Sequence, residues 1–248
     1  MKKISFIIVL ISGILSFQPS VSFAQFKIML GPVVGLTSPT ADYGGTPSDY
    51  YEGYYYGLKP GFNFGVAGKL NHGHLNINLS ILYSSMGNSG AADINTSGST
   101  VDYSQHLLTI GIGPQFGFGV PASPVIPYIG LDFLVSSISG SSTFQGTSNV
   151  PSGTVNMKTA TRTGLGLDGG VGIKLFNVQF DLSLRYNMIN LFGKSYSGSQ
   201  TGGRIEAYKY LNDANDPYHS VANDEQHPVE GNRIIATIQF ELGVMFGF

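Results

Sequence analysis

The last sixteen residues, 233–248, constrain the fold of this chain most. They read RIIATIQFELGVMFGF, in which every even position from Ile234 to Phe248 is apolar, whereas Arg233 and Glu241 fall on odd positions. A period of two residues predicts a β-strand with one apolar face. The segment is longer than the usual strand of about five or six residues, and it suits a tilted strand crossing a bilayer, which needs roughly nine to eleven. The rest of the chain can be tested against that architecture.

The composition is that of a glycine-rich β protein rather than a typical soluble enzyme. Of 248 residues, 34 are Gly, none is Cys or Trp, and 11% are charged. Residues 1–24 have a basic start, an apolar run and a small-residue end, which predicts a secretory signal peptide that is removed before Gln25. No apolar run of about 18 residues follows, so a membrane crossing would require a closed barrel, because an open sheet edge cannot be satisfied in lipid.

Seven further segments alternate apolar with polar or small residues. They lie at about 26–36, 58–70, 75–85, 103–118, 128–138, 160–175 and 178–188. The connections alternate long and short, and the longest covers about 190–232, which is the pattern of a porin-like, even-numbered barrel with both termini in the periplasm. The sequence therefore predicts an all-β fold, an eight-stranded antiparallel up-and-down transmembrane β-barrel, formed by one domain over 25–248.

Charged side chains indicate which face meets lipid. Eleven of them fall within the predicted strands, and none shares the parity of the apolar face: Lys27, Lys59, Lys69, Asp132, Arg162, Asp168, Lys174, Asp181, Arg185, Arg233 and Glu241. A lipid-facing Lys or Arg near the midplane costs about 2–4 kcal/mol, so their absence is expected of a surface in a bilayer. A soluble eight-stranded barrel would instead carry its charges outside.

Several segments together resemble a known family. The signal peptide ending in Phe-Ala-Gln, the first strand FKIMLGPVVGL, the glycine-rich strands and the terminal GVMFGF are similar to the outer-membrane β-barrel-domain (PorT-like) proteins of Bacteroidota. The resemblance implies a barrel in the outer membrane and supplies no catalytic residues. A final amphipathic strand ending in Phe also resembles the signal by which the assembly machinery recognises such barrels, and this implies that role for Phe246 and Phe248.

Four strand residues are predicted to form a charge network inside the barrel, namely Asp132, Asp168, Arg185 and Glu241, with Arg185 between Asp168 and Glu241. Other charges form a layer on each side of the network: Lys27, Lys69, Lys174 and Asp181 toward the short turns, and Lys59, Arg162 and Arg233 toward the long loops. An eight-stranded interior is only wide enough for side chains, so these charges are expected to pair and close the lumen. A narrow ion path lined by the same residues is the alternative.

The histidines offer two candidate sites. His72 and His74 could be two metal ligands, but nothing nearby supplies a third, and we interpret them as solvated turn residues. His106 lies near the outer end of its strand, close in sequence to Asp102 and Ser104, the residue types of a hydrolytic triad. Only geometry defines such a triad, and the enzyme remains a secondary hypothesis.

The predicted outer loops are acidic. Their acids are Asp42, Asp49, Glu52, Asp93, Asp102, Glu206, Asp213, Asp216, Asp224, Glu225 and Glu230, and their bases are Lys158, Lys194, Arg204 and Lys209. Clustered carboxylates suit Ca²⁺ or Mg²⁺. The densest stretch, 213–225, lacks the spacing of a dedicated calcium loop, so a solvated loop is the favoured interpretation.

A tyrosine cluster lies in the first long loop, at Tyr50, Tyr51, Tyr54, Tyr55 and Tyr56. Because it lies close to the second strand, we expect these rings at the lipid headgroup level, with a recognition patch for a glycan or protein as the alternative.

The sequence predicts a non-enzymatic integral outer-membrane barrel with a filled lumen, long extracellular loops and a surface-structural or interaction role. We expect no cofactor. The expected partners are outer-membrane lipids, the assembly machinery at the C-terminal strand, and an extracellular ligand or protein at the loops. Nucleic acid is not expected, because there is no basic stripe. A lipid- or peptide-modifying barrel enzyme and a small pore or transport accessory remain the alternatives.

Overall fold

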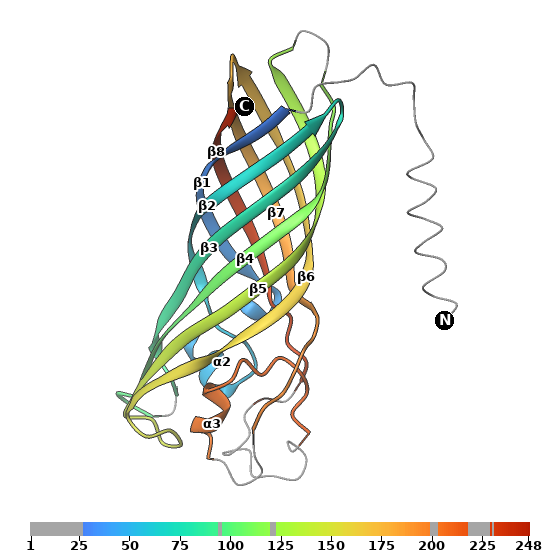
Figure 1. Ribbon diagram of the computed structural model, residues 1–248. Coiled ribbons are helices and arrows are strands. Elements are labelled where there is room, and N and C mark those ends of the chain that lie inside the picture. The colour runs from blue at the N-terminus through green and yellow to red at the C-terminus, as the bar shows by residue number, and fades with distance from the viewer. Residues whose placement is uncertain (1–26, 94–95, 120–122, 199–202, 218–228, 230) are drawn as a thin grey trace, which may run out of the picture.

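The computed structural model describes residues 27–93, 96–119, 123–198, 203–217, 229 and 231–248. Eight antiparallel strands close into one barrel, each paired with its neighbours in the chain and β8 paired with β1 (Figure 1). The strands are β1 (Lys27–Thr40), β2 (Lys59–His72), β3 (Leu75–Ala91), β4 (Thr100–Gly117), β5 (Val125–Gln145), β6 (Gly153–Leu175), β7 (Val178–Phe192) and β8 (Ala236–Gly247). The predicted eight-stranded antiparallel barrel is confirmed. The predicted signal peptide, 1–24, lies outside the described residues.

The two ends of the barrel differ. At one end, here called the turn end, residues 73–74 and 176–177 make tight connections, and Phe248 donates a backbone hydrogen bond to the carbonyl of Ile28 at 2.9 Å. The other end, the loop end, carries the short helices η1 (Ala41–Tyr43), α2 (Pro47–Glu52) and α3 (Ile205–Tyr208). Figure 1 places the turn end at the top, with α2 and α3 at the lower end of the barrel. No helix among the described residues is long and apolar enough to span a membrane.

Most strands extend beyond their predicted ends on the loop side. β5 continues to Gln145 rather than 138, and β6 begins at Gly153 rather than 160. These extensions are rich in Ser, Thr and Gly, so the hydrophobic alternation used for the prediction stops before they do. Their extended conformation comes from pairing, since Phe144 stands opposite Gly153 in the β5–β6 ladder. The first three long loops are accordingly shorter than predicted, whereas the loop between β7 and β8 keeps its predicted length.

The outward face is apolar, as predicted. Ile77, Leu131 and Phe240 expose 47%, 49% and 51% of their surface outside the barrel. Eight of the eleven strand charges are buried instead: Lys69, Asp132, Arg162, Asp168, Asp181, Arg185, Arg233 and Glu241. Lys27 and Lys174 are partly buried at the turn end.

Lys59 is the exception to this division. It was predicted inside, but it is exposed, and its neighbour Leu58 is buried at 2% exposure. The β2–β3 register shifts between Lys59 and Phe62. A bulge adds one residue to a strand and reverses the alternation beyond it. The alternation of 58–70 predicts Leu58 on the apolar outer face and Lys59 inside, and both placements are wrong.

Candidate functional site

Arg185 of β7 is at the centre of the lumen. Its Nη1 lies 2.9 Å from Asp132 Oδ2 and 3.1 Å from Ser80 Oγ, and its Nε lies 3.9 Å from Glu241 Oε2. Asp168 is its partner in the β6–β7 ladder, but among the described residues Asp168 is hydrogen-bonded by Gln115 at 3.2 Å and forms no ion pair with Arg185. The structure therefore brings Arg185 to Asp132, two strands away, and to Glu241.

Two carboxylates, those of Asp132 and Glu241, pair with this one guanidinium, and side-chain amides supply further hydrogen bonds to them. Asn63 donates to Glu241 at 2.8 Å, and Asn78 donates to Asp132 at 3.2 Å. Taking a charge out of water costs several kcal/mol unless partners replace the solvent. The amides therefore contribute to holding this charge-rich layer in a narrow interior.

A second layer lies nearer the turn end. Lys69 forms an ion pair with Asp181, and the Tyr128 hydroxyl donates to the same carboxylate. Gln179 adds a hydrogen bond to Asp181 at 3.0 Å, and the Lys69 ammonium lies 4.1 Å from the centre of the Tyr128 ring. This layer separates the central network from the turn end.

At the loop end, Arg162 of β6 holds the longest loop against the barrel. Its Nε and Nη2 donate to the two oxygens of Asp213 at 2.8 and 2.7 Å, in the bidentate geometry that suits a guanidinium and a carboxylate. Asn190 and the backbone N–H of Ser195 also donate to Asp213, each at 2.8 Å. Burial raises the pKa of Asp213, but these hydrogen bonds outweigh it, so the pKa lies below the ordinary value of 3.8.

Asp213 is fully buried, so the interpretation of 213–225 as a solvated loop is wrong at this residue. The reason is the approach of Arg162, which is far away in sequence. The predicted acids Asp224, Glu225 and Glu230 lie outside the described residues.

Aromatic side chains fill the mouth of the barrel at the loop end. We call the following group the tyrosine cap: Tyr43, Tyr50, Tyr51, Tyr56, Tyr103, Phe144 and Tyr208, all buried. Tyr50 stacks on Tyr103 with ring centres 4.1 Å apart, and its hydroxyl lies 2.5 Å from Ser142 Oγ. Burial raises the pKa of Tyr50 to about 12, against the opposing hydrogen bond of Ser142, so the phenol is neutral.

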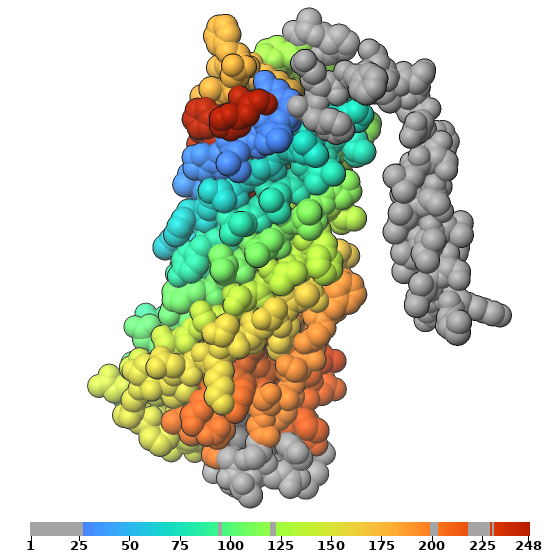
Figure 2. Space-filling view, in the orientation of Figure 1, coloured from blue at the N-terminus to red at the C-terminus, as the bar shows by residue number. Residues whose placement is uncertain are grey.

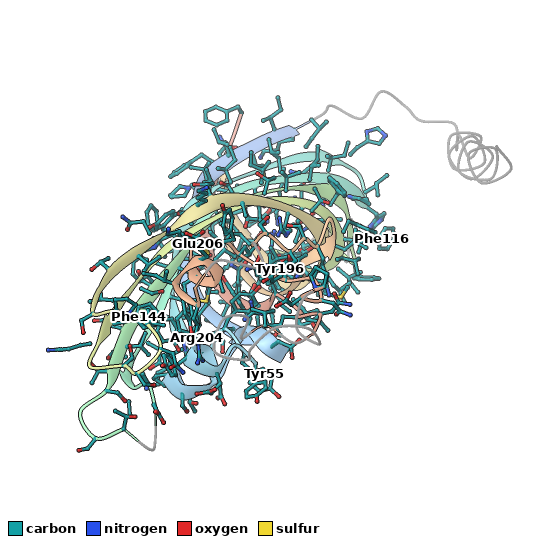
Figure 3. All side chains as sticks on the ribbon, turned by 90° about the horizontal axis from the view of Figure 1, so that it is seen from below. Tyr55, Phe116, Phe144, Tyr196, Arg204 and Glu206 are labelled. Carbon is teal, nitrogen blue, oxygen red and sulfur yellow. The ribbon has the colours of Figure 1, made fainter. Side chains whose placement is uncertain are left out.

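Two arginines connect the tyrosine cap to the β7–β8 loop. The Arg204 guanidinium lies 4.2 Å from the centre of the Tyr51 ring, and that of Arg233 lies 4.1 Å from the centre of the Tyr56 ring. Figure 3 looks along the barrel from the loop end and shows Arg204 within the barrel outline and Tyr55 at its edge.

The placement of Tyr50, Tyr51 and Tyr56 at the headgroup level is wrong, because all three are buried over the mouth of the barrel. Tyr54 and Tyr55 are exposed at 51% and 43%. The local cause is α2, which begins with a capping box between Thr46 and Asp49 and ends at Gly53 with a φ of 81°. The motif Thr-Pro-Ser-Asp, with Gly53 after it, is a sequence signal for a short helix, and the prediction of tyrosines at the headgroup level did not take it into account.

The structure does not assemble the His106 triad. His106 Nδ1 lies 3.1 Å from Ser85 Oγ, and its ring stacks on Tyr83 with ring centres 5.7 Å apart. Among the described residues no hydrogen bond joins His106 to Asp102 or Ser104. His74 Nδ1 lies 3.0 Å from the carbonyl oxygen of Gly117. In the described part of the chain, no group of three or more His, Asp or Glu side chains is placed to hold a metal.

Several solved structures are similar to this chain. Neisserial surface protein A is 18% identical, with 90% of this chain and 97% of that chain covered and a TM-score of 0.45. OprG from Pseudomonas aeruginosa is 12% identical, with 90% and 96% covered and a TM-score of 0.47. Ail from Yersinia pestis is 12% identical, with 91% and 100% covered and a TM-score of 0.38. No curated protein matches the sequence.

The model of the family described as outer membrane protein beta-barrel domain matches residues 15–193. Because this match covers more than two thirds of the chain, the protein belongs to the outer membrane protein beta-barrel domain family.

Proposed function

We propose that the protein is a closed, non-enzymatic outer-membrane barrel whose capped loop end serves a structural or interaction role at the cell surface. The observation that carries the proposal is the filled interior: the Lys69–Asp181 pair, the Arg185 network and the tyrosine cap follow one another from turn end to loop end. Eight strands enclose an interior just wide enough for side chains, so paired and packed groups leave no path for solutes.

The proposed orientation puts the turn end and both termini in the periplasm and the loop end outside the cell. Short periplasmic turns and longer outer loops are the rule for barrels of this class. The proposal includes removal of the signal peptide 1–24 and a place among the PorT-like proteins of Bacteroidota, supported by the residues that carry that resemblance. It includes no cofactor and no nucleic-acid partner.

The loop end offers a shaped surface for an extracellular ligand or protein. The first loop contributes Tyr43, Tyr50, Tyr51 and Tyr56 to the tyrosine cap, and their burial holds this loop on the barrel, while Tyr54 and Tyr55 remain exposed. The β5–β6 hairpin projects to one side of the loop end, at the lower left of Figure 2. Exposed tyrosines on a rigid base supply contact area at a small cost in side-chain entropy, which favours binding. The other proposed partners are outer-membrane lipids on the apolar face and the assembly machinery at β8.

Conductance in a planar bilayer tests the closed lumen. The wild-type protein is expected to give no steady current. Arg185→Ala leaves Asp132 and Glu241 without their guanidinium, which should destabilise the barrel by about 3–5 kcal/mol or admit water and ions. Lys59→Ala is the matched control, because Lys59 is exposed outside the lumen. Steady current from the wild type would favour the pore and contradict our proposal.

The enzyme alternative has its own test. If His106 were catalytic, His106→Ala would change the lipid composition of the outer membrane. We expect no change, because His106 contacts Ser85 and Tyr83 on the outer face.

A further inference from the structure

A pocket of about 290 Å³ opens at the turn end of the barrel. Its charged and polar lining includes Lys69, Lys174, Asn71, Gln115, Gln179 and His74. No acidic side chain is among the described residues that line it. Toward the Arg185 network the interior narrows to a space of only about 20 Å³, whose lining includes Tyr128 and Asp181.

Positive charge at this pocket is only partly compensated. Lys69 forms an ion pair with Asp181. Lys174 is half-buried, and the charges that act on it are those of Lys27 and Lys69. Within the described residues neither Lys27 nor Lys174 forms an ion pair. The pocket lining therefore holds two ammonium groups, Lys69 and Lys174, of which Lys174 has no ion pair among the described residues, and the nearby charge of Lys27 adds to theirs.

A hydrogen-bond donor in the same pocket is also unused. The side-chain nitrogen of Asn71 is buried and has no hydrogen-bond partner among the described residues. Asn71 lines the pocket and stands opposite Lys27 in the β1–β2 ladder. A buried donor is costly when unpaired, so an acceptor in the pocket would be stabilising.

We infer that this pocket binds a doubly charged phosphate, either inorganic phosphate or the phosphate group of a small monoester. Such a group carries about −1.5 to −2 charges at pH 7, so the positive charges of Lys174, Lys69 and the nearby Lys27 attract it more strongly than a singly charged carboxylate. Lysine ammonium groups bind phosphate as compact point charges, and the side-chain nitrogen of Asn71 offers N–H donors to its oxygens. Gln115 and Gln179 already donate to Asp168 and Asp181, so each can offer only its second amide hydrogen. The volume lies at the lower end of the roughly 300–1,000 Å³ of small-molecule pockets. The inference does not depend on which side of the membrane the pocket faces.

Lysine acetylation of the folded wild-type barrel in detergent tests this directly. Inorganic phosphate at about four times its Kd is expected to slow acetylation of Lys174 about fivefold, in proportion to the free fraction. Acetylation of Lys59, which is exposed near the opposite end, is expected to stay constant. Chloride at equal ionic strength controls for screening, and acetate tests a carboxylate. The inference is overturned if phosphate leaves Lys174 unprotected, if chloride protects it equally, or if acetate protects it as well as phosphate does.

Calorimetric titration with inorganic phosphate gives a second measurement. Lys174→Gln should weaken binding by about tenfold or more, equivalent to about 1.4 kcal/mol, whereas Lys59→Gln should bind like the wild type. Heat-modifiable migration in gels shows whether each variant is folded. A folded Lys174→Gln protein that binds phosphate with wild-type affinity would also overturn the inference. If that variant does not fold, the acetylation result on the wild type decides.

Discussion

At the scale of single residues, the Arg162–Asp213 pair decides whether the β7–β8 loop stays on the barrel. Arg162 is buried at 6% exposure, and its two hydrogen bonds to Asp213 span 51 positions of sequence. A buried charge that loses its partner costs about 3–5 kcal/mol. The loop can avoid that cost only by detaching and letting water reach the guanidinium.

Asp213→Ala is therefore expected to open the loop. Trypsin should cleave the folded variant at Lys194, Arg204 or Lys209 at least about tenfold faster than the wild type, since each 1.4 kcal/mol of opening free energy changes the open population tenfold. Glu206→Gln is the matched control, because the Glu206–Lys209 pair at 2.6 Å joins partly exposed side chains of α3 and its C-cap residue, and such pairs contribute little. Equal cleavage rates for wild type and Asp213→Ala would contradict this role.

The same pair predicts a pH dependence. The pKa of Asp213 lies below 3.8 in the folded protein, so its contribution to stability is fully present above the unfolded value of about 3.9 and is lost as pH falls through the folded pKa. The amide of Ser195, which donates to Asp213, should lose protection from hydrogen exchange below about pH 3.8 after correction for the intrinsic rate. In Asp213→Asn the protection of that amide should not change with pH in this range.

At the scale of elements, glycines allow neighbouring strands to approach closely. A Cβ on Gly113 of β4 would lie 1.9 Å from the carbonyl oxygen of Leu131 and 2.8 Å from Cα of Asp132. On Gly169 of β6, the nearest atom would be the carbonyl oxygen of Tyr128 at 3.6 Å, an ordinary contact. Substitution by Ala should therefore change the stability of the barrel at Gly113 and not at Gly169.

We predict that Gly113→Ala destabilises the barrel by about 1–3 kcal/mol, because β5 must shift away from the new methyl group. Gly169→Ala should stay within about 0.5 kcal/mol of the wild type. Reversible urea unfolding in lipid vesicles measures both. Two variants of equal stability would show that the β4–β5 ladder absorbs the methyl group without cost.

The last strand carries the predicted assembly signal. Phe246 and Phe248 are exposed at 47% and 82% on the apolar side, and Phe248 contributes the backbone hydrogen bond to Ile28. Deleting Phe248 removes little of the barrel's packing, so we expect a marked loss of insertion into the outer membrane with little change in stability in detergent. Phe240→Ala, within the same strand, is the control. Normal amounts of the truncated protein in the outer membrane would contradict the assembly role.

At the scale of the whole molecule, the proposed orientation can be tested by labelling. The chain has no cysteine, so single substitutions give an unambiguous signal. Ser148→Cys, in the exposed β5–β6 loop, should react with a membrane-impermeant maleimide on intact cells. Asn177→Cys, in the exposed β6–β7 turn, should react only after the outer membrane is opened. The reverse result would place the turn end outside.

The sequence by itself determined the strands, their faces and their closure into a barrel. Alternation is local: a strand shows its apolar side in consecutive residues, so β8 could be predicted from residues 233–248 alone. The side of the strand on which a charged residue lies is also given by its neighbours in sequence. Eight of the eleven charged residues that were predicted to face the interior are buried. The prediction failed at Lys59, because a bulge depends on the register with β3 and not on the composition of β2.

Only the tertiary structure decided which groups meet. Arg185 is hydrogen-bonded to Asp132, which is 53 positions away in the sequence, and Arg162 to Asp213, which is 51 positions away. The turn-end pocket likewise combines side chains from several strands, such as Lys69 of β2 and Lys174 of β6. Periodicity states which side of a strand a residue faces, but an ion pair, a tyrosine cap or a pocket also needs the stagger between strands and the path of each loop. Those are set by the closed ring of backbone hydrogen bonds, which no single segment of the sequence contains.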